Sequence, residues 1–353
     1  MGGCDDQRCG PRIVGDTVTE DLRLDLQRKD RLLPDIDWTV LPEGTVASTF
    51  DAPSGPLAVI SLGEQSRPRV VLVPGVTGSK EDFQYLMREM VAAGFHVQSF
   101  DLAGQYESDL AGPWNRSQSQ SQSQVRNRSQ DTNRSQDTNR SQDTNQSQDR
   151  DQDPPETAYT MDLFVNDLIA FLESGRTPVH LVGYSFAGVV AELVAVGRPD
   201  LVRSLALLGP PPDPGQSFRT IPFLGQLSRF ARPGVVATLM RWGVVANVLR
   251  VKPGRLKFVR DRFTRTRRDA HRDIMGLMMH TPDLEQELRA LQVPKAVAVG
   301  TRDLWPVARH RRFAESIGAR LHVYGTGHSP CEDAPYELSA DLISLFEQAG
   351  PES

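Results

Sequence analysis

The chain has 353 residues, which is enough for two domains or for one large α/β domain with additions. Its formal net charge is −5, from 40 basic and 45 acidic side chains, which argues against a generally basic nucleic-acid-binding protein. Hydrophobic residues make up 39% of the chain, enough for a sizeable core, yet no run of 18 apolar residues predicts a membrane-spanning helix.

The first 37 residues are predicted to be an N-terminal tail. Residues 1–12 lack the apolar stretch of a secretion signal, and Asp6 stands where a myristoylation signal has Ser or Thr. The three cysteines, Cys4, Cys9 and Cys331, have the spacing of neither a disulfide framework nor a zinc site. We therefore expect a reduced, cytoplasmic protein without a bound metal.

Strand-like apolar runs alternate with helical patterns from residue 38 onward. The predicted strands are 45–50, 57–62, 70–73, 96–100, 179–182, 204–208, 296–299 and 320–324. Several are continuously apolar, which is typical of a sheet covered on both faces. One helical stripe consists of Met161, Phe164, Val165, Leu168, Ile169 and Leu172. The alternation predicts an α/β fold with a doubly wound, mostly parallel sheet.

A glycine-containing loop follows the third predicted strand. Gly75 and Gly78 permit a turn there, and the N–H of Val76 is a candidate donor to a developing negative charge. A phosphate-binding loop is the alternative, but the spacing of the glycines and the absence of a Gly-Lys-Ser/Thr ending argue against it. Ser79, with Asp82 three residues later, resembles the start of a helix over 83–93.

Residues 115–153 form a low-complexity segment that consists, except for Val125, of Asn, Arg, Ser, Gln, Asp and Thr. The hexapeptide RSQDTN occurs three times in tandem, and six Arg balance six Asp. Such a segment has no apolar surface to offset the entropy of ordering. We expect a disordered insert between two parts of the core, 38–114 and 154–211, with the last part at 289–353.

The sharpest local signal is the string GYSFAG at residues 183–188, between a predicted strand and a helical pattern. A side chain forced outward at a strand-to-helix turn needs small neighbours two positions away, and Gly183 and Ala187 supply them. The N-terminus of the helix behind Ser185 favours negative charge, and the N–H of Phe186 is a second candidate oxyanion donor. The pattern predicts that Ser185 is a nucleophile.

Residues 212–288 interrupt the strand-helix alternation and predict a helical cap inserted between two strands. Twelve basic residues and one acid, Asp261, lie between positions 229 and 268. This charge favours an anionic substrate, such as an acyl carrier thioester or a phospholipid, or contact with a negative membrane surface. The alternative is a solvated face that pairs with acids of the same molecule. Apolar cap residues either line an acyl pocket or only pack the cap.

A serine nucleophile needs a base, and the base needs an orienting carboxylate. His328 is the predicted base because it lies in a glycine-containing loop after the last predicted strand. Asp303 follows the penultimate strand and is the predicted acid. Three other carboxylates remain open for that role: Asp213, Glu332 and Asp333. We interpret the remaining histidines as structural or solvated: His96, His180, His271, His280, His310 and His322.

With Ser185, Asp303 and His328 in this order, the sequence from about residue 38 to 349 resembles the α/β-hydrolase superfamily. Residues 100–108 are similar to the family's Asp-x-x-Gly-x-Gly-x-Ser turn, with Tyr106 where Gly is usual. Pro74 stands where the family has the His of a His-Gly pair. The resemblance implies the α/β-hydrolase fold, a cap over the active site, and catalysis without a metal or an organic cofactor.

These residues predict a serine hydrolase that cleaves a small or medium carboxylic ester or thioester through an acyl-enzyme. Carbon–carbon bond hydrolysis, peptidase action and perhydrolase action would use the same residues and stay open. An epoxide hydrolase or dehalogenase would have Asp in place of Ser185. A ligand-sensing signalling protein is the alternative from another class. The expected partner is a small-molecule ester or thioester, anionic or with an acyl chain; peripheral membrane contact stays open, and no nucleic acid is expected.

Overall fold

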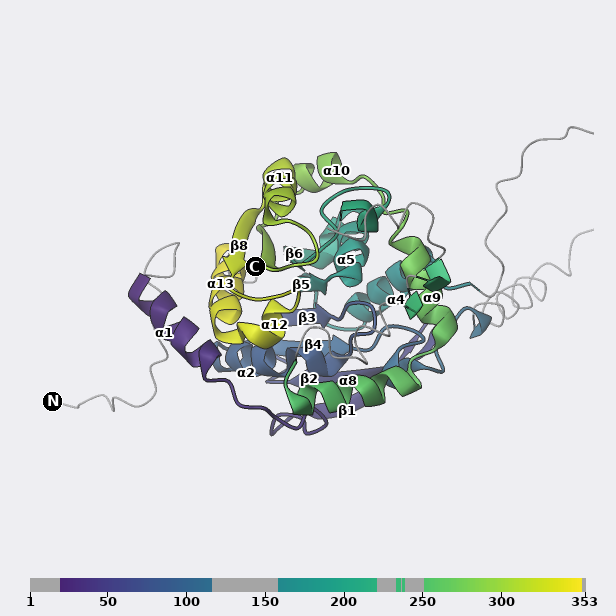
Figure 1. Ribbon diagram of the computed structural model, residues 1–353, viewed down its shortest axis with the longest axis horizontal. Coiled ribbons are helices and arrows are strands. Elements are labelled where there is room, and N and C mark those ends of the chain that lie inside the picture. Colours follow the sequence, from purple (N-terminus) through teal and green to yellow (C-terminus); the bar gives the residue numbers. More distant parts are fainter. Residues whose placement is uncertain (1–19, 116–157, 221–232, 236, 239–250, 351–353) are drawn as a thin grey trace, which may run out of the picture.

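The structure is a computed structural model that describes residues 20–115, 158–220, 233–235, 237–238 and 251–350. In these ranges one eight-stranded sheet is flanked by helices on both faces (Figure 1). The strands are β1 Val46–Ala52, β2 Gly55–Leu62, β3 Arg69–Val73, β4 His96–Phe100, β5 Val179–Tyr184, β6 Val202–Leu208, β7 Lys295–Gly300 and β8 Arg320–Tyr324.

The strand order across the sheet is β1-β2-β4-β3-β5-β6-β7-β8. β2 pairs antiparallel with β1 and with β4, and every other pairing is parallel. All eight strands lie where the apolar runs predict them, so the mostly parallel, doubly wound sheet is confirmed. Every residue of β3, β5 and β7 is buried, because helices cover both faces of the sheet there.

The α-helices of the described ranges are α1 Glu20–Arg31, α2 Gln84–Ala92, α4 Met161–Glu173, α5 Phe186–Gly197, α8 Pro253–Arg265, α9 Arg268–Leu277, α10 Glu285–Ala290, α11 Val307–Ile317, α12 Pro330–Asp333 and α13 Pro335–Gln348. Short 3-10 helices in the same ranges are η1 Lys80–Phe83, η2 Tyr106–Ser108, η3 Pro199–Leu201 and η4 Ser217–Thr220. One core cluster packs α4, α5 and α11 against the sheet, and a second packs α2, α12 and α13 against its other face (Figure 1).

Helix α4 shows how the sequence pattern becomes packing. Thr160 caps the helix by accepting a hydrogen bond from the backbone N–H of Leu163. In the predicted stripe, Phe164, Leu168 and Leu172 are buried and the other three residues are half-buried. Phe164 meets the ring of Phe186, the first residue of α5, at 5.2 Å between centroids. This contact fixes the helix that begins directly behind Ser185.

Helix α1 lies in the predicted tail but packs on α13. Most of its side chains are charged, so the sequence has no apolar stripe from which this helix could be predicted. Arg23 forms a 2.8 Å ion pair with Asp341, and Asp30 accepts the backbone N–H groups of Tyr336 and Glu337 at the start of α13. Burial raises the pKa of Asp30 to about 6. Helix α1 is therefore held by capping and ion pairs more than by apolar burial.

Between β6 and β7, the part of the chain that the structure describes forms η4, α8, α9 and α10 and adds no strand to the sheet. A helical insertion is thus present within residues 212–288, while its limits stay a prediction. The repeat insert lies, apart from Asn115, outside the described residues, as does much of the cap between 221 and 250. Among described helices, none has both the length and the apolar composition needed to span a membrane.

Candidate active site

Ser185 occupies a strained turn between β5 and α5. Its φ of 54° and ψ of −117° lie in a region that residues with side chains rarely adopt. The backbones before and after it approach so closely that a Cβ on Gly183 would lie 2.5 Å from the carbonyl oxygen of Ala187. A larger residue at position 183 would push strand and helix apart, so the small residues are required by the turn.

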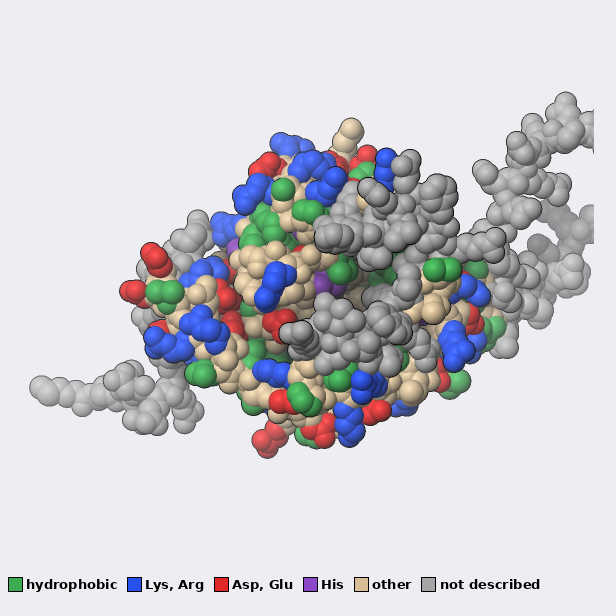
Figure 2. Space-filling view, viewed as in Figure 1, with side chains coloured by type: hydrophobic (Ala, Val, Ile, Leu, Met, Phe, Trp, Pro, Cys, Tyr) green, Lys and Arg blue, Asp and Glu red, His purple; other side chains and the backbone are tan. Residues whose placement is uncertain are grey.

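The three residues predicted from the sequence meet beyond the carboxyl ends of β5, β7 and β8. His328 Nε2 lies 3.1 Å from Ser185 Oγ, and His328 Nδ1 lies 3.0 Å from Asp303 Oδ1. The side chain of Asp303 is fully buried and that of His328 is 15% exposed. Figure 2 shows a histidine side chain near the hollow in the middle of the face viewed in Figure 1. This chain of contacts can pass a proton from the hydroxyl to the imidazole.

The structure also shows what the other candidate acids contact. Asp213 binds Arg309 and Arg312, and Glu332 binds Arg255. Among described residues, no hydrogen bond joins either of these carboxylates, or Asp333, to His328. The geometry therefore favours Asp303 as the acid.

Two aromatic rings and a glycine hold the imidazole of His328, and the sequence did not predict them as site residues. The rings of Tyr184 and Trp305 lie 5.3 and 5.7 Å from it between centroids. The hydroxyl of Tyr184 is 2.7 Å from Ser329 Oγ, which ties the nucleophile turn to the histidine loop. At Gly209, with a φ of 49°, an added Cβ would lie 3.0 Å from the imidazole. The signals in the sequence were that Tyr184 directly precedes Ser185 and that Trp305 lies two residues after Asp303.

The loop after β3 closes the site on one side. A Cβ on Gly75 would lie 3.0 Å from Ser185 Cβ, and the N–H of Gly78 donates to the carbonyl of Gly75 at 2.9 Å. Within the described ranges, the backbone N–H groups of Val76 and Phe186 donate to no other residue. Both groups thus have no acceptor among the described residues, which is compatible with the oxyanion-binding role that we predict for them.

Buried charges lie directly behind this loop. The ammonium of Lys80 lies 2.8, 3.0 and 2.7 Å from carboxylates of Glu81, Asp101 and Glu107. Burial raises the pKa of Asp101 to about 7, although Lys80 acts in the opposite direction. Tyr106, which stands where the family usually has Gly, adopts a positive φ of 43°. The tyrosine thus keeps the backbone shape of the family turn at the cost of local strain.

A second buried network joins the cap to the same loop. Asp82 Oδ1 accepts hydrogen bonds from Arg255 at 2.7 Å and from Arg262 at 2.6 Å, both on α8. Its other oxygen accepts the N–H of Ser79, and Arg255 also binds Glu332. Burial acts to raise the pKa of Asp82, but the two guanidinium groups outweigh it and hold the pKa below its ordinary value. Two basic residues of the cap therefore pair internally with core acids.

Replacing Asp82 with Asn is expected to destabilise the protein by about 3–5 kcal/mol, because it removes the carboxylate that pairs with the buried guanidinium of Arg262 and leaves Arg255 with Glu332 alone. Denaturant unfolding measures this change in the free energy of unfolding. Lys257→Gln is the matched control, since Lys257 is an exposed basic residue of α8, the helix that carries Arg255 and Arg262. A loss at Asp82 no larger than in this control would show that the network adds nothing to stability.

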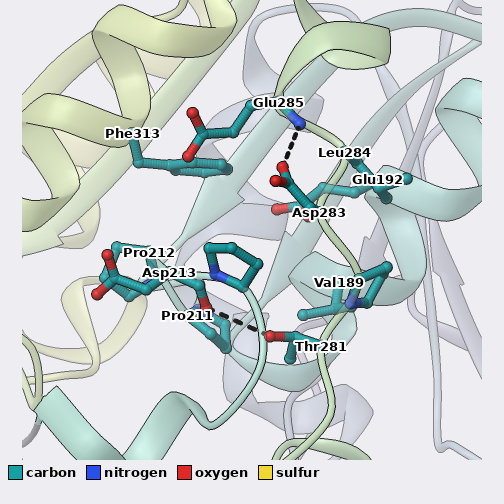
Figure 3. A pocket seen from close by; sticks show the side chains of 12 residues that line it. Val189, Glu192, Pro211, Pro212, Asp213, Thr281, Asp283, Leu284, Glu285 and Phe313 are labelled. Atoms are coloured by element: carbon teal, nitrogen blue, oxygen red, sulfur yellow. Dashed lines mark hydrogen bonds between the residues drawn. The ribbon is translucent and has the colours of Figure 1, made fainter.

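A separate pocket lies between α5, the loop that follows β6, and α11 (Figure 3). Glu192, Asp213, Thr281 and Phe313 are among its lining residues, and no member of the Ser-His-Asp group lines it. Burial raises the pKa of Glu192 to about 8. Within the described residues, no cluster of three or more His, Cys, Asp or Glu side chains is arranged to hold a metal ion.

Comparison with known proteins agrees with this fold. The model of the alpha/beta hydrolase family matches residues 70–342, which is most of the chain. The protein belongs to the alpha/beta hydrolase family. The sequence-based expectation of the α/β-hydrolase fold is thereby confirmed.

Comparisons with individual proteins give less information about this chain than the family model does. The chain is 43% identical to a protein named lipase LipV from Mycobacterium tuberculosis over 60 residues, which cover 17% of this chain and 23% of the lipase. A structure reported for carboxylesterases of Nitrososphaera gargenis has a TM-score of 0.60 at 18% identity, covering 86% of this chain and 98% of that one. An epoxide hydrolase of Vigna radiata has a TM-score of 0.59 at 15% identity, covering 87% of this chain and 99% of the epoxide hydrolase. The structural likenesses show the fold alone.

Proposed function

We propose that the protein is a serine hydrolase that cleaves a small or medium carboxylic ester or thioester through an acyl-enzyme. The observation that carries the proposal is the unbroken chain from Ser185 Oγ through His328 to the buried carboxylate of Asp303. The fold alone does not decide the chemistry, because esterases and an epoxide hydrolase resemble it equally well. Serine at the turn favours acyl transfer, since an epoxide hydrolase would need a carboxylate there.

In the proposed reaction, Ser185 Oγ attacks the acyl carbon while His328 Nε2 takes the hydroxyl proton. Asp303 accepts the Nδ1–H, which fixes the tautomer and stabilises the imidazolium. The imidazolium then protonates the leaving alcohol or thiol. Water, deprotonated by the same imidazole, attacks the acyl carbon; the bond to Ser185 Oγ then breaks, the imidazolium returns its proton to that oxygen, and the acid is released. General acid–base catalysis of this kind typically contributes about 10²–10⁴-fold to the rate.

The negative charge that forms on the acyl oxygen needs donors that are already in place. The N–H groups of Val76 and Phe186 are the candidates, because neither is used by another described residue. Each such donor typically lowers the barrier by about 3–4 kcal/mol. The N-terminal end of α5 adds its dipole at the same point.

A substrate panel tests the proposal. Purified protein is incubated with p-nitrophenyl esters of increasing acyl length, with acyl thioesters and with anilides, and with a fluorophosphonate probe. We expect turnover of esters or thioesters above that of anilides and labelling of one serine. Labelling without turnover of any substrate would favour the ligand-sensing alternative. The absence of both labelling and turnover would contradict the proposed function.

The cap's basic residues provide a prediction about substrate charge. Arg260, Arg265 and Arg268 are exposed, and Arg265 forms a 3.2 Å ion pair with Glu107. Changing all three to Glu is expected to raise KM for anionic esters, or to weaken vesicle binding, more at low salt than at high salt. KM is compared for a neutral and an anionic ester of equal acyl length. If both respond equally, the basic residues play no part in selecting an anionic substrate.

A further inference from the structure

A second histidine lies beside the acid of the proposed site. His310, on α11, is completely buried, and its Nε2 lies 4.0 Å from Asp303 Oδ1. Neither of its ring nitrogens forms a hydrogen bond with a described residue. A buried imidazole without partners is costly, because its polar atoms lose their contacts with water. A phenyl or aliphatic side chain would fill the same space without this cost.

The carboxylate of Asp303 has few partners of its own. Oδ1 receives the N–H of His328 and a long, 3.4 Å contact from the backbone N–H of Trp305. Oδ2 is buried and has no hydrogen-bond partner among the described residues. The imidazole of His310 is therefore a further polar group against a carboxylate that water does not reach.

The surroundings of His310 keep the imidazole neutral. Burial lowers its pKa to about 4, Asp303 and Asp213 act to raise it, and His328 acts to lower it. Trp305 stands edge-on to both imidazoles, at 6.2 Å from His310 and 5.7 Å from His328, and its indole N–H donates to the carbonyl of Ser217. The indole is thus anchored between the two histidines.

We propose that His310 is a positioning residue of the hydrolase site: its Nε2–H points at Asp303 and stabilises the negative charge of that carboxylate. The proposal rests on the proposed function of Ser185, His328 and Asp303. A neutral imidazole with its proton on Nε2 presents the positive end of an N–H dipole to Oδ1. Such an interaction is strong in a buried site, where little solvent screens it. His310 itself does not touch the reacting atoms.

The direction of the effect follows from charge. When both ring nitrogens of His328 are protonated, the His328–Asp303 pair is neutral overall. When only Nδ1 is protonated, the imidazole is neutral and the pair carries one negative charge. The dipole of His310 stabilises the negative state more, so it makes the pair release its proton at lower pH. Removing the dipole should let the pair keep its proton to higher pH. The acidic limb of the kcat/KM profile would move in the same direction, since only the unprotonated imidazole accepts the serine proton.

The experiment compares His310→Leu with His310→Gln, in which the amide nitrogen can occupy the place of Nε2. We expect His310→Leu to move the acidic limb of kcat/KM for a p-nitrophenyl ester upward by about half a pH unit or more, and His310→Gln to restore it. His180→Leu is the matched control, because His180 is a buried imidazole elsewhere in the core. It should lower the melting temperature without moving the profile.

Two results would overturn the proposal. One is a His310→Leu enzyme that loses activity equally at every pH, and the other is a shift that His310→Gln does not reverse. If His310→Leu does not fold, His310→Asn replaces it, since its shorter amide cannot reach the position of Nε2. NMR titration of the histidine ring signals separates this test from the proposed function. The titration midpoint of the His328 ring should move upward in the variant even if no tested ester is turned over, and an unchanged midpoint would contradict the role of His310.

Discussion

Replacing Ser185 with Ala is expected to abolish ester turnover and fluorophosphonate labelling while leaving the fold intact. Loss of the serine in a Ser-His-Asp group typically lowers kcat by about 10⁶-fold, since base and acid have nothing left to activate. The side chain of Ser185 contacts His328 through its hydroxyl, and Ala removes only that oxygen. Turnover of a p-nitrophenyl ester, gel-based detection of the probe and the melting temperature together measure the outcome.

Ser174→Ala is the control for this variant. Ser174 lies at the end of α4, where its hydroxyl donates to the carbonyl of Phe171. The Ser174→Ala protein should react with the fluorophosphonate probe to the same extent as the unchanged protein. Labelling of the Ser185→Ala protein at the unchanged level would remove Ser185 from the role of nucleophile. A large fall in melting temperature would instead mean that the strained turn needs the serine for folding.

The sheet and the nucleophile turn were predictable because their signals are local. A strand buried on both faces must be apolar along its length, and all eight runs became strands at nearly the expected residues. A strand-to-helix turn with an outward side chain tolerates only small residues two positions before and after it, and this pattern identified Ser185 in the sequence. The carboxyl ends of parallel strands lie at one edge of the sheet, so Asp303 and His328 had to come near it.

The missed features depend on contacts between distant residues. The sequence left open whether the basic residues of the cap pair with acids of the same molecule, but it did not indicate Asp82, which is more than 170 positions away from Arg255 and Arg262 in the chain. Helix α1 is mostly charged, and only its contacts with α13 explain it. His310 looked like an ordinary histidine of a helix. Nothing in its local pattern indicates that α11 brings it to Asp303.

Replacing Asp303 with Asn should lower kcat by about 10⁴-fold while KM changes little. Asn has the size of Asp, so it fits the fully buried position. Its NH₂ group, however, can donate to His328 Nδ1 and thereby leave the imidazole proton on Nε2. That tautomer cannot accept the proton of Ser185, whose Oγ lies 3.1 Å from Nε2. Substrate binding does not use the carboxylate, and therefore the loss should fall on kcat.

Asp213→Asn is the matched control, because Asp213 was the other carboxylate expected near the end of a central strand. Its side chain binds Arg309 and Arg312, and both guanidinium groups are about half exposed. Exposed pairs of this kind contribute about 0–1 kcal/mol, so the variant should keep its turnover and nearly all of its stability. If kcat fell by orders of magnitude in Asp213→Asn and by less than tenfold in Asp303→Asn, the acid would have to be reassigned. The hydrogen bond of 3.0 Å between Asp303 and His328 would then be structural only.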